Sequence, residues 1–218
     1  MNLAIFDLDN TLIGGDSDSL WGQYLAESGM VDGAFYAREN QRFYEEYEAG
    51  DLDIFEFLRF SLKPLADNPL PELLALRERF MADKIAPIML PQAEQLLQQH
   101  RDQGHELLII TATNRFVTQP IAAALGIDEL IATEPEMIDG RYTGDVAGTP
   151  SFREGKVERL NQWLSDKGYN LASSWFYSDS HNDLPLLEMV THPFAVDADD
   201  TLSQHAEMKG WPVISLRD

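Results

Sequence analysis

Five short apolar segments are spaced along the chain, and stretches with amphipathic helical periodicity lie between them. Continuously apolar segments of this length predict strands that are buried on both faces. Strands of this kind that alternate with helices favour an α/β fold, with a parallel sheet covered by helices on both faces. The expected strands are residues 3–7, 105–111, 174–180, 193–197 and 211–216, and the clearest helices between them are residues 91–105 and 155–168.

Residues 16–86 have a different pattern from the rest of the chain. They contain four helix-like stretches rich in aromatic residues and no clear strand. We therefore expect a helical cap domain of residues 16–86, inserted after the first strand of a core made of residues 1–15 and 87–218. We expect most of the cap aromatics to pack in its interior. Within the core, Asp139-Gly140 between alternating residues predicts a β-hairpin in 132–146.

Composition excludes several classes of partner and chemistry. The chain has 37 Asp and Glu against 16 Lys and Arg, a formal charge of −21, which argues against nucleic acid and against anionic membranes. A small phosphorylated metabolite stays compatible, because a few local cations and backbone amides can bind one phosphate. The chain has no cysteine, so disulfides and thiolate catalysis are excluded. With neither a signal peptide nor a long apolar run, we expect a cytoplasmic protein without a membrane span.

Polar residues gather where the predicted strands end. Asp7 and Asp9 follow the first strand, Thr111 ends the second, and Asp179 ends the third. Lys156 begins the helix before that third strand. Each has a common alternative explanation, such as an Asx turn, a helix cap or a solvated lysine. Because the carboxyl ends of parallel strands share one edge of a sheet, we expect these side chains to meet in one crevice.

In their order along the chain, these motifs resemble those of the haloacid dehalogenase superfamily of phosphohydrolases. The resemblance extends over the whole chain. The position of the helical insert and the segment SDSHNDLPLL are similar to the phosphoserine-phosphatase-like branch, subfamily IB. The resemblance implies a Rossmann-like core with an inserted helical-bundle cap of the C1 type. The matching motifs are Asp7-Leu-Asp9-Asn-Thr11, Thr111, Lys156 and Asp179-Ser-His-Asn-Asp183.

The resemblance also implies catalytic and metal-binding roles. Asp7 is the expected nucleophile, which forms an aspartyl-phosphate. Asp9 would protonate the leaving alcohol and then accept a proton from water. The carboxylates of Asp7 and Asp179, with the backbone carbonyl of Asp9, would hold Mg²⁺, and Asp183 would orient these ligands.

Phosphate binding is expected from three further residues. The Thr111 hydroxyl and the neighbouring backbone amide of Ala112 would hold phosphate oxygens. Lys156 would neutralise charge on Asp7 and on the transferring group. His181 lies within the fourth motif and is expected to point to solvent. Arg153 could assist phosphate binding or simply sit at a helix start.

The substrate is less constrained than the reaction. In relatives that hydrolyse phosphoserine, an acidic residue after the first motif meets the substrate ammonium, and a cap arginine meets its carboxylate. Asp16 lies near the acidic position, with Asp18 two residues further on. Arg59 is the nearest arginine, but it falls a couple of residues early, and Ser61 stands at the expected place. This spacing favours a substrate with an amine and without a carboxylate.

Histidinol phosphate is such a substrate, and its imidazole could stack on cap aromatics. The stretches GGDSD, ITATNRFV, DGRYTG and FREGKV also resemble a bacterial subgroup linked to histidinol-phosphate hydrolysis. Phosphoserine or another small phosphomonoester is the alternative, and a mutase of the same fold is another. Asp9 argues against a dehalogenase, and the intact motifs argue against a binding module. We expect a monomer or a homodimer.

Overall fold

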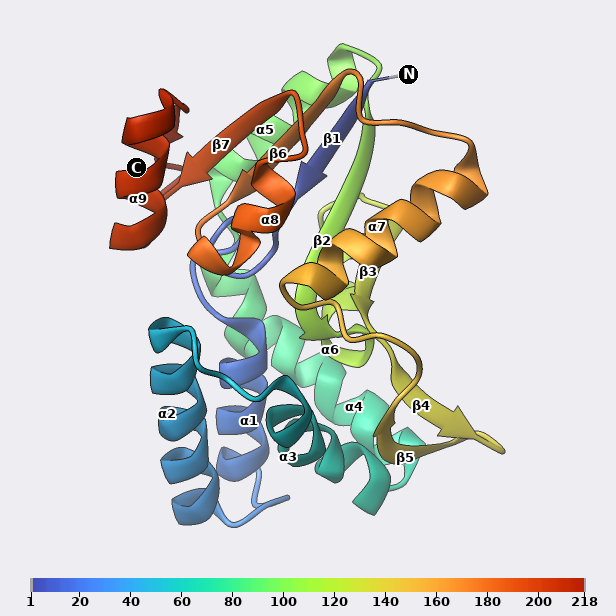
Figure 1. Ribbon diagram of the computed structural model, residues 1–218. Helices are drawn as coiled ribbons and strands as arrows, with labels where there is room; N and C mark the ends of the chain where they lie inside the picture. The colour runs from blue at the N-terminus through green and yellow to red at the C-terminus, as the bar shows by residue number, and fades with distance from the viewer. Residues whose placement is uncertain (1, 218) are drawn as a thin grey trace.

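The computed structural model describes residues 2–217, except the side chain of Glu48, so Met1 and Asp218 at the ends of the predicted core lie outside it. In this part of the chain, six parallel strands form one sheet in the order β3-β2-β1-β6-β7-β8 (Figure 1). The predicted parallel sheet is thus confirmed. The strands are β1 (Leu3–Phe6), β2 (Glu106–Asn114), β3 (Glu129–Thr133), β6 (Ser174–Ser178), β7 (His192–Val196) and β8 (Val213–Ile214).

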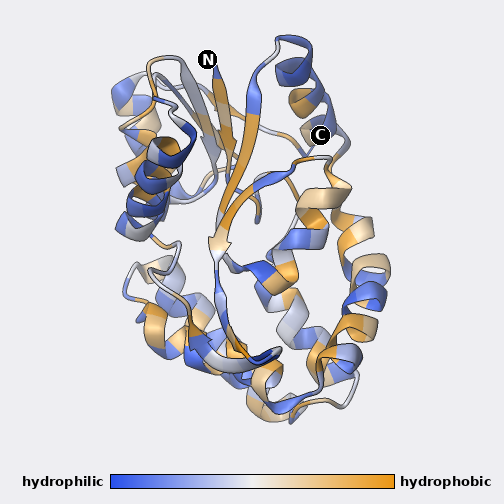
Figure 2. Cartoon of the chain, turned by 90° about the vertical axis from the view of Figure 1, so that its right-hand side faces the viewer, coloured by the Kyte–Doolittle hydropathy of each residue, from blue (hydrophilic) through white to orange (hydrophobic). Residues whose placement is uncertain are grey.

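Helices cover both faces of this sheet, and each face has its own apolar core. Alternate residues of β1 divide between the cores, with Ala4 and Phe6 in one and Leu3 and Ile5 in the other. The strands are mostly apolar, whereas the helices carry apolar and polar residues on different sides (Figure 2). The first face packs against α5 (Pro91–Asp102) and α6 (Arg115–Ala124), and the second against α7 (Glu154–Lys167), α8 (Leu184–Leu187) and α9 (Asp200–Lys209).

Helices from the first third of the chain form a layer beyond the end of the sheet to which β1 and β2 point (Figure 1). Asp16, Asp32 and Asp53 begin three of these helices, and each side chain accepts a backbone N–H of the first turn. No helix within residues 2–217 is long and apolar enough to cross a membrane. The helices are α1 (Ser17–Glu27), α2 (Gly33–Ala49), α3 (Ile54–Asp67), α4 (Leu70–Phe80), a π-helical turn (Met81–Ile85) and a 3₁₀ turn (Ala86–Ile88).

The predicted hairpin is present as β4 (Pro135–Ile138) and β5 (Arg141–Val146). Asp139 and Gly140 both have positive φ angles, of 51° and 76°, which suit the tight turn between these antiparallel strands. The hairpin extends from the core and packs against α3 (Figure 1). A Cβ added at Gly144 would lie 3.3 Å from the Cβ of Ala66, so glycine permits this close approach.

His100 is a buried histidine of α5, and its protonation should make the free energy of unfolding depend on pH. The Nδ1 atoms of His100 and His105 lie 2.7 Å apart. The Nε2 atom of His100 lies 2.9 Å from the hydroxyl of Tyr177. Burial lowers the pKa of His100 to about 4, and the neighbouring His105 adds to the effect. Since the unfolded chain binds this proton at an ordinary pKa near 6.5, the unfolded state gains protons first as pH falls.

We therefore expect the free energy of unfolding to decrease as pH falls from 7 to 5. The His100→Gln variant, which keeps a hydrogen-bonding side chain without this titration, should lose about 2 kcal/mol less over the same range. Urea unfolding of both proteins at the two pH values measures the difference. Equal losses in the two proteins would contradict this account of His100.

Candidate active site

The topology places the motif residues at one edge of the sheet. Strand β1 lies between β2 and β6, so Asp7 after β1, Thr111 in β2 and Asp179 after β6 are neighbours. All three line one cavity of about 360 Å³, between the sheet edge and the helical layer. Asp9, Ala112, Lys156 and Asp16 also line it. The structure thus brings together most of the residues expected from the sequence.

Lys156 joins two buried carboxylates at the bottom of the cavity. It lies in the first turn of α7, and its side chain is 5% exposed. Its Nζ donates to Asp7 Oδ1 at 2.7 Å and to Asp183 Oδ2 at 2.8 Å. The Ser178 hydroxyl donates to the same oxygen of Asp183 at 2.7 Å. Asp183 is not among the residues that line the cavity. Its hydrogen bond instead holds Lys156 next to Asp7.

Asp9 is fixed by three donors after the chain leaves β1. Its Oδ2 accepts from the hydroxyls of Thr111 at 3.2 Å and Thr113 at 3.0 Å, and its Oδ1 accepts from the backbone N–H of Ser17 at 2.6 Å. The Thr111 hydroxyl therefore faces Asp9 in this structure, besides lining the cavity. Thr113 was not anticipated, although residues 111 and 113 share one face of a strand by simple alternation.

The electrostatics of the cavity are dominated by aspartates. Among the described residues, seven aspartates line it against one lysine. Burial raises the pKa of Asp7 to about 7 despite the attraction of Lys156, and the charges of Asp183 and Asp9 add to the rise. Burial also raises the pKa of Asp179 well above its usual range, with the charge of Asp7 as the next cause. Such crowding favours a bound cation.

The α1 end of the cavity carries two more carboxylates. Asp16 Oδ1 accepts the backbone N–H of Ser19 at 2.8 Å, so Asp16 both begins α1 and lines the cavity. Asp18 Oδ1 accepts from Asn114 Nδ2 at 3.1 Å. Burial raises the pKa of Asp16 to about 6 and that of Asp18 to about 8, and neighbouring aspartates contribute to both. Arg59 is exposed on α3 and is not among the residues that line the cavity.

The end of α2 is joined to the core beside the cavity. The Tyr47 hydroxyl lies 2.9 Å from Ser180 Oγ. The guanidinium of Arg153 donates to the Gly50 carbonyl and, at 2.8 Å, to Asn182 Oδ1. Arg153 adopts a positive φ of 49°, a region that disfavours side chains other than glycine. Arg153 thus connects the helical layer to the core by hydrogen bonds. It is not among the residues that line the cavity.

His181 also differs from the expectation of a solvent-facing residue. It lines the cavity, and its Nδ1 lies 2.9 Å from Asp199 Oδ2. Asp199, Asp200 and Thr201 line the cavity too. These three residues precede or begin α9, a helix that the sequence pattern did not predict, so they were missed with it. Of the aromatic residues in 16–86, Phe43, Tyr44, Tyr47 and Phe57 line the cavity.

Comparison with known proteins identifies the family. The model of the haloacid dehalogenase-like hydrolases matches residues 4–188. The chain belongs to this family. A histidinol-phosphatase from Neisseria meningitidis is 49% identical to it, over 99% of each chain. A phosphoserine phosphatase from Mycobacterium tuberculosis is 31% identical, over 98% of this chain and 70% of that protein.

Solved structures of similar proteins agree with the assignment of the fold. A protein of unknown function from Bordetella pertussis has a TM-score of 0.93 and 47% identity, covering 99% of this chain and 98% of that one. A substrate-bound phosphoserine phosphatase has a TM-score of 0.71 and 22% identity, covering 100% and 94%. The predicted family and fold of this haloacid dehalogenase-like hydrolase are confirmed, as is the prediction that it is an enzyme, a phosphatase.

Proposed function

We propose that the protein is a Mg²⁺-dependent phosphatase that hydrolyses histidinol phosphate through a phosphorylated Asp7. The observation that carries the reaction is the position of Asp7. Its carboxylate lines the cavity and is held at Oδ1 by Lys156, and Asp9 is fixed by hydroxyl and amide donors nearby. This pair of carboxylates supplies a nucleophile and a separate group for proton transfer.

The reaction then has two steps. An Asp7 oxygen attacks phosphorus, the bond from phosphorus to the alcohol oxygen breaks, and Asp9 gives its proton to that oxygen. Asp9 next takes a proton from a water molecule whose oxygen attacks phosphorus. The bond from phosphorus to the Asp7 oxygen breaks, which restores the Asp7 carboxylate and releases inorganic phosphate. Lys156 neutralises negative charge beside Asp7 in both steps. The hydroxyls of Thr111 and Thr113 hold the Asp9 carboxyl group in one orientation during both steps.

The donor atoms at the sheet edge fit Mg²⁺. Asp7 is buried and Asp179 half-buried, their carboxylates repel each other, and a divalent cation would offset that repulsion. Residues 2–217 contain no group of three or more Asp, Glu, His or Cys side chains arranged as a metal site. The set proposed here needs two carboxylates, completed by the Asp9 carbonyl and water. When bound, the ion supplies positive charge against the phosphate dianion.

Histidinol phosphate is our first candidate because of the residues that line the cavity. They include acidic and aromatic side chains, and Lys156 is the only Lys or Arg among the described residues that line it. A substrate carboxylate would face Asp16 and Asp18, whereas an amine would be attracted by them. The Neisseria relative named histidinol-phosphatase supports this choice. We further propose that residues 16–86 act as the cap and that the enzyme works in the cytoplasm. The expected monomer or homodimer stays a prediction.

The test is phosphate release from histidinol phosphate, phosphoserine, phosphoethanolamine, sugar phosphates and p-nitrophenyl phosphate. We expect kcat/KM for histidinol phosphate to exceed every other value by at least about tenfold. EDTA should abolish turnover and added Mg²⁺ should restore it. Faster turnover of phosphoserine would overturn the substrate assignment. Conversion of a sugar phosphate to an isomer without free phosphate would instead indicate a mutase.

A further inference from the structure

We propose that Asp18 and Asn40 form a second recognition subsite, which binds a ring N–H of the substrate at the α1–α2 side of the cavity. The inference rests on the proposed function, because it assigns the imidazole of histidinol phosphate to these two residues. The amine is left to Asp16. The subsite therefore favours substrates that contain such a ring in addition to the phosphate and the amine.

Asn40 is the first observation behind this proposal. Its side chain lines the cavity, and among residues 2–217 it has no hydrogen-bond partner. It occupies the space left by the absent side chain of Gly22 on α1, where an added Cβ would lie 2.5 Å from Asn40 Nδ2. Asn40 is half-buried, so its amide, which is fitted closely against a glycine and has no partner in the described chain, is accessible to a ligand in the cavity.

Asp18 borders the same cavity as Asn40 and is held by a residue at the end of β2. Asn114 donates to one of its carboxylate oxygens. Asp18 and Asn40 also border a second, small space of about 10 Å³ inside the helical layer. Trp21, which is 2% exposed, and Ser61 border the same space, and their buried Nε1 and Oγ atoms have no partner within the described chain. Polar groups therefore extend from the cavity wall into the layer behind it.

The surroundings of this pair suit a flat ring with an N–H donor. Phe43, Tyr44 and Phe57 line the same cavity, and the rings of Phe43 and Phe57 meet edge to face with centroids 5.3 Å apart. Aromatic faces pack well against a planar ring. A carboxyl group can accept an N–H, and a protonated ring beside it would favour its ionised form, while an amide can either donate or accept. Imidazole offers one nitrogen of each kind, or two donors when protonated.

The test compares Asp18→Asn and Asn40→Leu with wild type. The first measure is the ratio of kcat/KM for histidinol phosphate to kcat/KM for p-nitrophenyl phosphate. We expect this ratio to fall by at least about tenfold in both variants, because each leaves a ring nitrogen without its partner. Gly22→Ala, which displaces Asn40 without changing it, should move the ratio in the same direction. Asp67→Asn, an exposed α3 residue paired with Lys63, is the control and should leave the ratio unchanged.

A second measure keeps this inference separate from the proposed function. L-Histidinol, which has the amine and the ring without phosphate, should inhibit hydrolysis of p-nitrophenyl phosphate by wild type. We expect its inhibition constant to rise by at least about tenfold in Asp18→Asn and Asn40→Leu, and ethanolamine to show no such change. Inhibition constants within twofold of wild type would overturn the subsite. A wild-type preference for phosphoserine would instead overturn the proposed function.

Discussion

Replacing Asp7 by Asn is expected to lower kcat for every phosphomonoester by at least about 10³-fold. An amide oxygen is a far weaker nucleophile than a carboxylate, and the neighbouring Asp9 is held by Thr111, Thr113 and Ser17, so it cannot take over the attack without leaving them. The measurement is steady-state phosphate release with saturating substrate and Mg²⁺.

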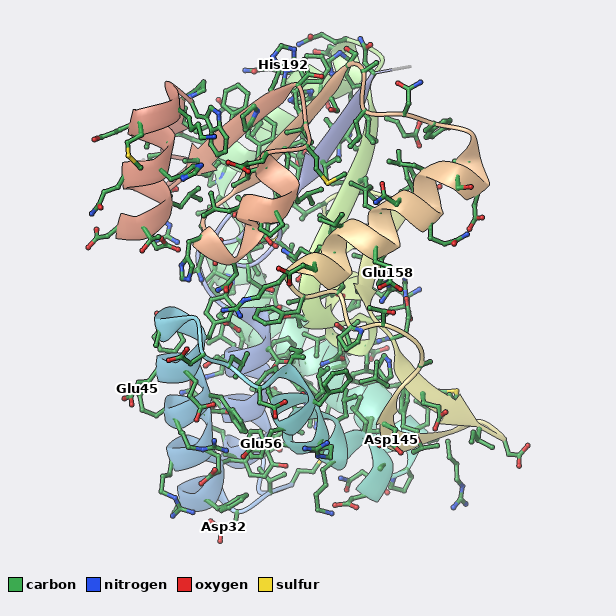
Figure 3. The ribbon with its side chains drawn as sticks, viewed as in Figure 1. Asp32, Glu45, Glu56, Asp145, Glu158 and His192 are labelled. Atoms are coloured by element: carbon green, nitrogen blue, oxygen red, sulfur yellow. The ribbon has the colours of Figure 1, made fainter. Side chains whose placement is uncertain are left out.

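The fold of this variant should remain intact. Burial already raises the pKa of Asp7, which means that its ionised form is costly inside the protein, and Lys156 keeps Asp183 as a partner after the substitution. Asp145→Asn is the matched control, since Asp145 is an exposed residue of the hairpin (Figure 3) and does not line the cavity. A folded Asp7→Asn protein with more than a tenth of wild-type activity would show that Asp7 is not the nucleophile.

Replacing Lys156 by Met should affect both stability and activity. The methionine is of similar length, but it leaves Asp7 and Asp183 buried without their shared cation. Removing one member of a buried ion-paired group costs about 3–5 kcal/mol, because the remaining charge is uncompensated. Turnover should fall by at least about 10²-fold, since positive charge beside the phosphoryl group is lost. Urea unfolding and kcat measure the two effects.

The double variant Lys156→Met/Asp183→Asn separates these two effects. It removes one of the two orphaned carboxylates, so it should regain part of the lost stability relative to Lys156→Met. It should not regain activity, because the cation beside Asp7 is still absent. Recovery of turnover together with stability would mean that Lys156 acts only by holding the fold. An unchanged free energy of unfolding in Lys156→Met would contradict the buried ion pairs.

Many acidic residues lie on the outer surface, so the net charge of the chain does not by itself indicate the charge of the cavity. Asp32, Glu45, Glu56, Asp145 and Glu158 project from the periphery of the helices and the hairpin (Figure 3). These exposed side chains contribute to the formal charge of −21 without lining the cavity. The charge that bears on chemistry is the local group of aspartates at the sheet edge.

The sequence was sufficient for the parts of the fold that have strong periodicity. Apolar runs in β1 and β2 located Asp7 and Thr111 in advance, although β2 does not end at Thr111 as expected but continues to Asn114. Helix α6 was missed because Pro120 interrupts its pattern, and β3 was missed because only Leu130 and Ile131 among its five residues are large and apolar. The packing of the hairpin on α3 depends on contacts distant in sequence, which no local pattern contains.

Helix α3 shows that the spacing of residues along the chain does not by itself say which side chains reach the cavity. Arg59 and Ser61 differ by two residues, but successive residues of a helix are turned by about 100° from one another. Arg59 is therefore exposed, while the Ser61 hydroxyl is buried beside Asp18 and Trp21. The sequence offers Asp16 as a helix cap or as a substrate ligand, and its position in the structure is compatible with both roles. Which side chains reach the cavity is known only from the three-dimensional arrangement.

The most direct test of the central claim is to trap phosphate on Asp7. The enzyme would be mixed with histidinol phosphate and Mg²⁺, quenched in acid within the first turnover, digested and examined by mass spectrometry. We expect the peptide that contains Asp7 to gain the mass of one phosphoryl group in wild type and not in Asp7→Asn. Phosphate release by wild type without any phosphorylated Asp7 peptide, at quench times shorter than one turnover, would contradict the covalent mechanism.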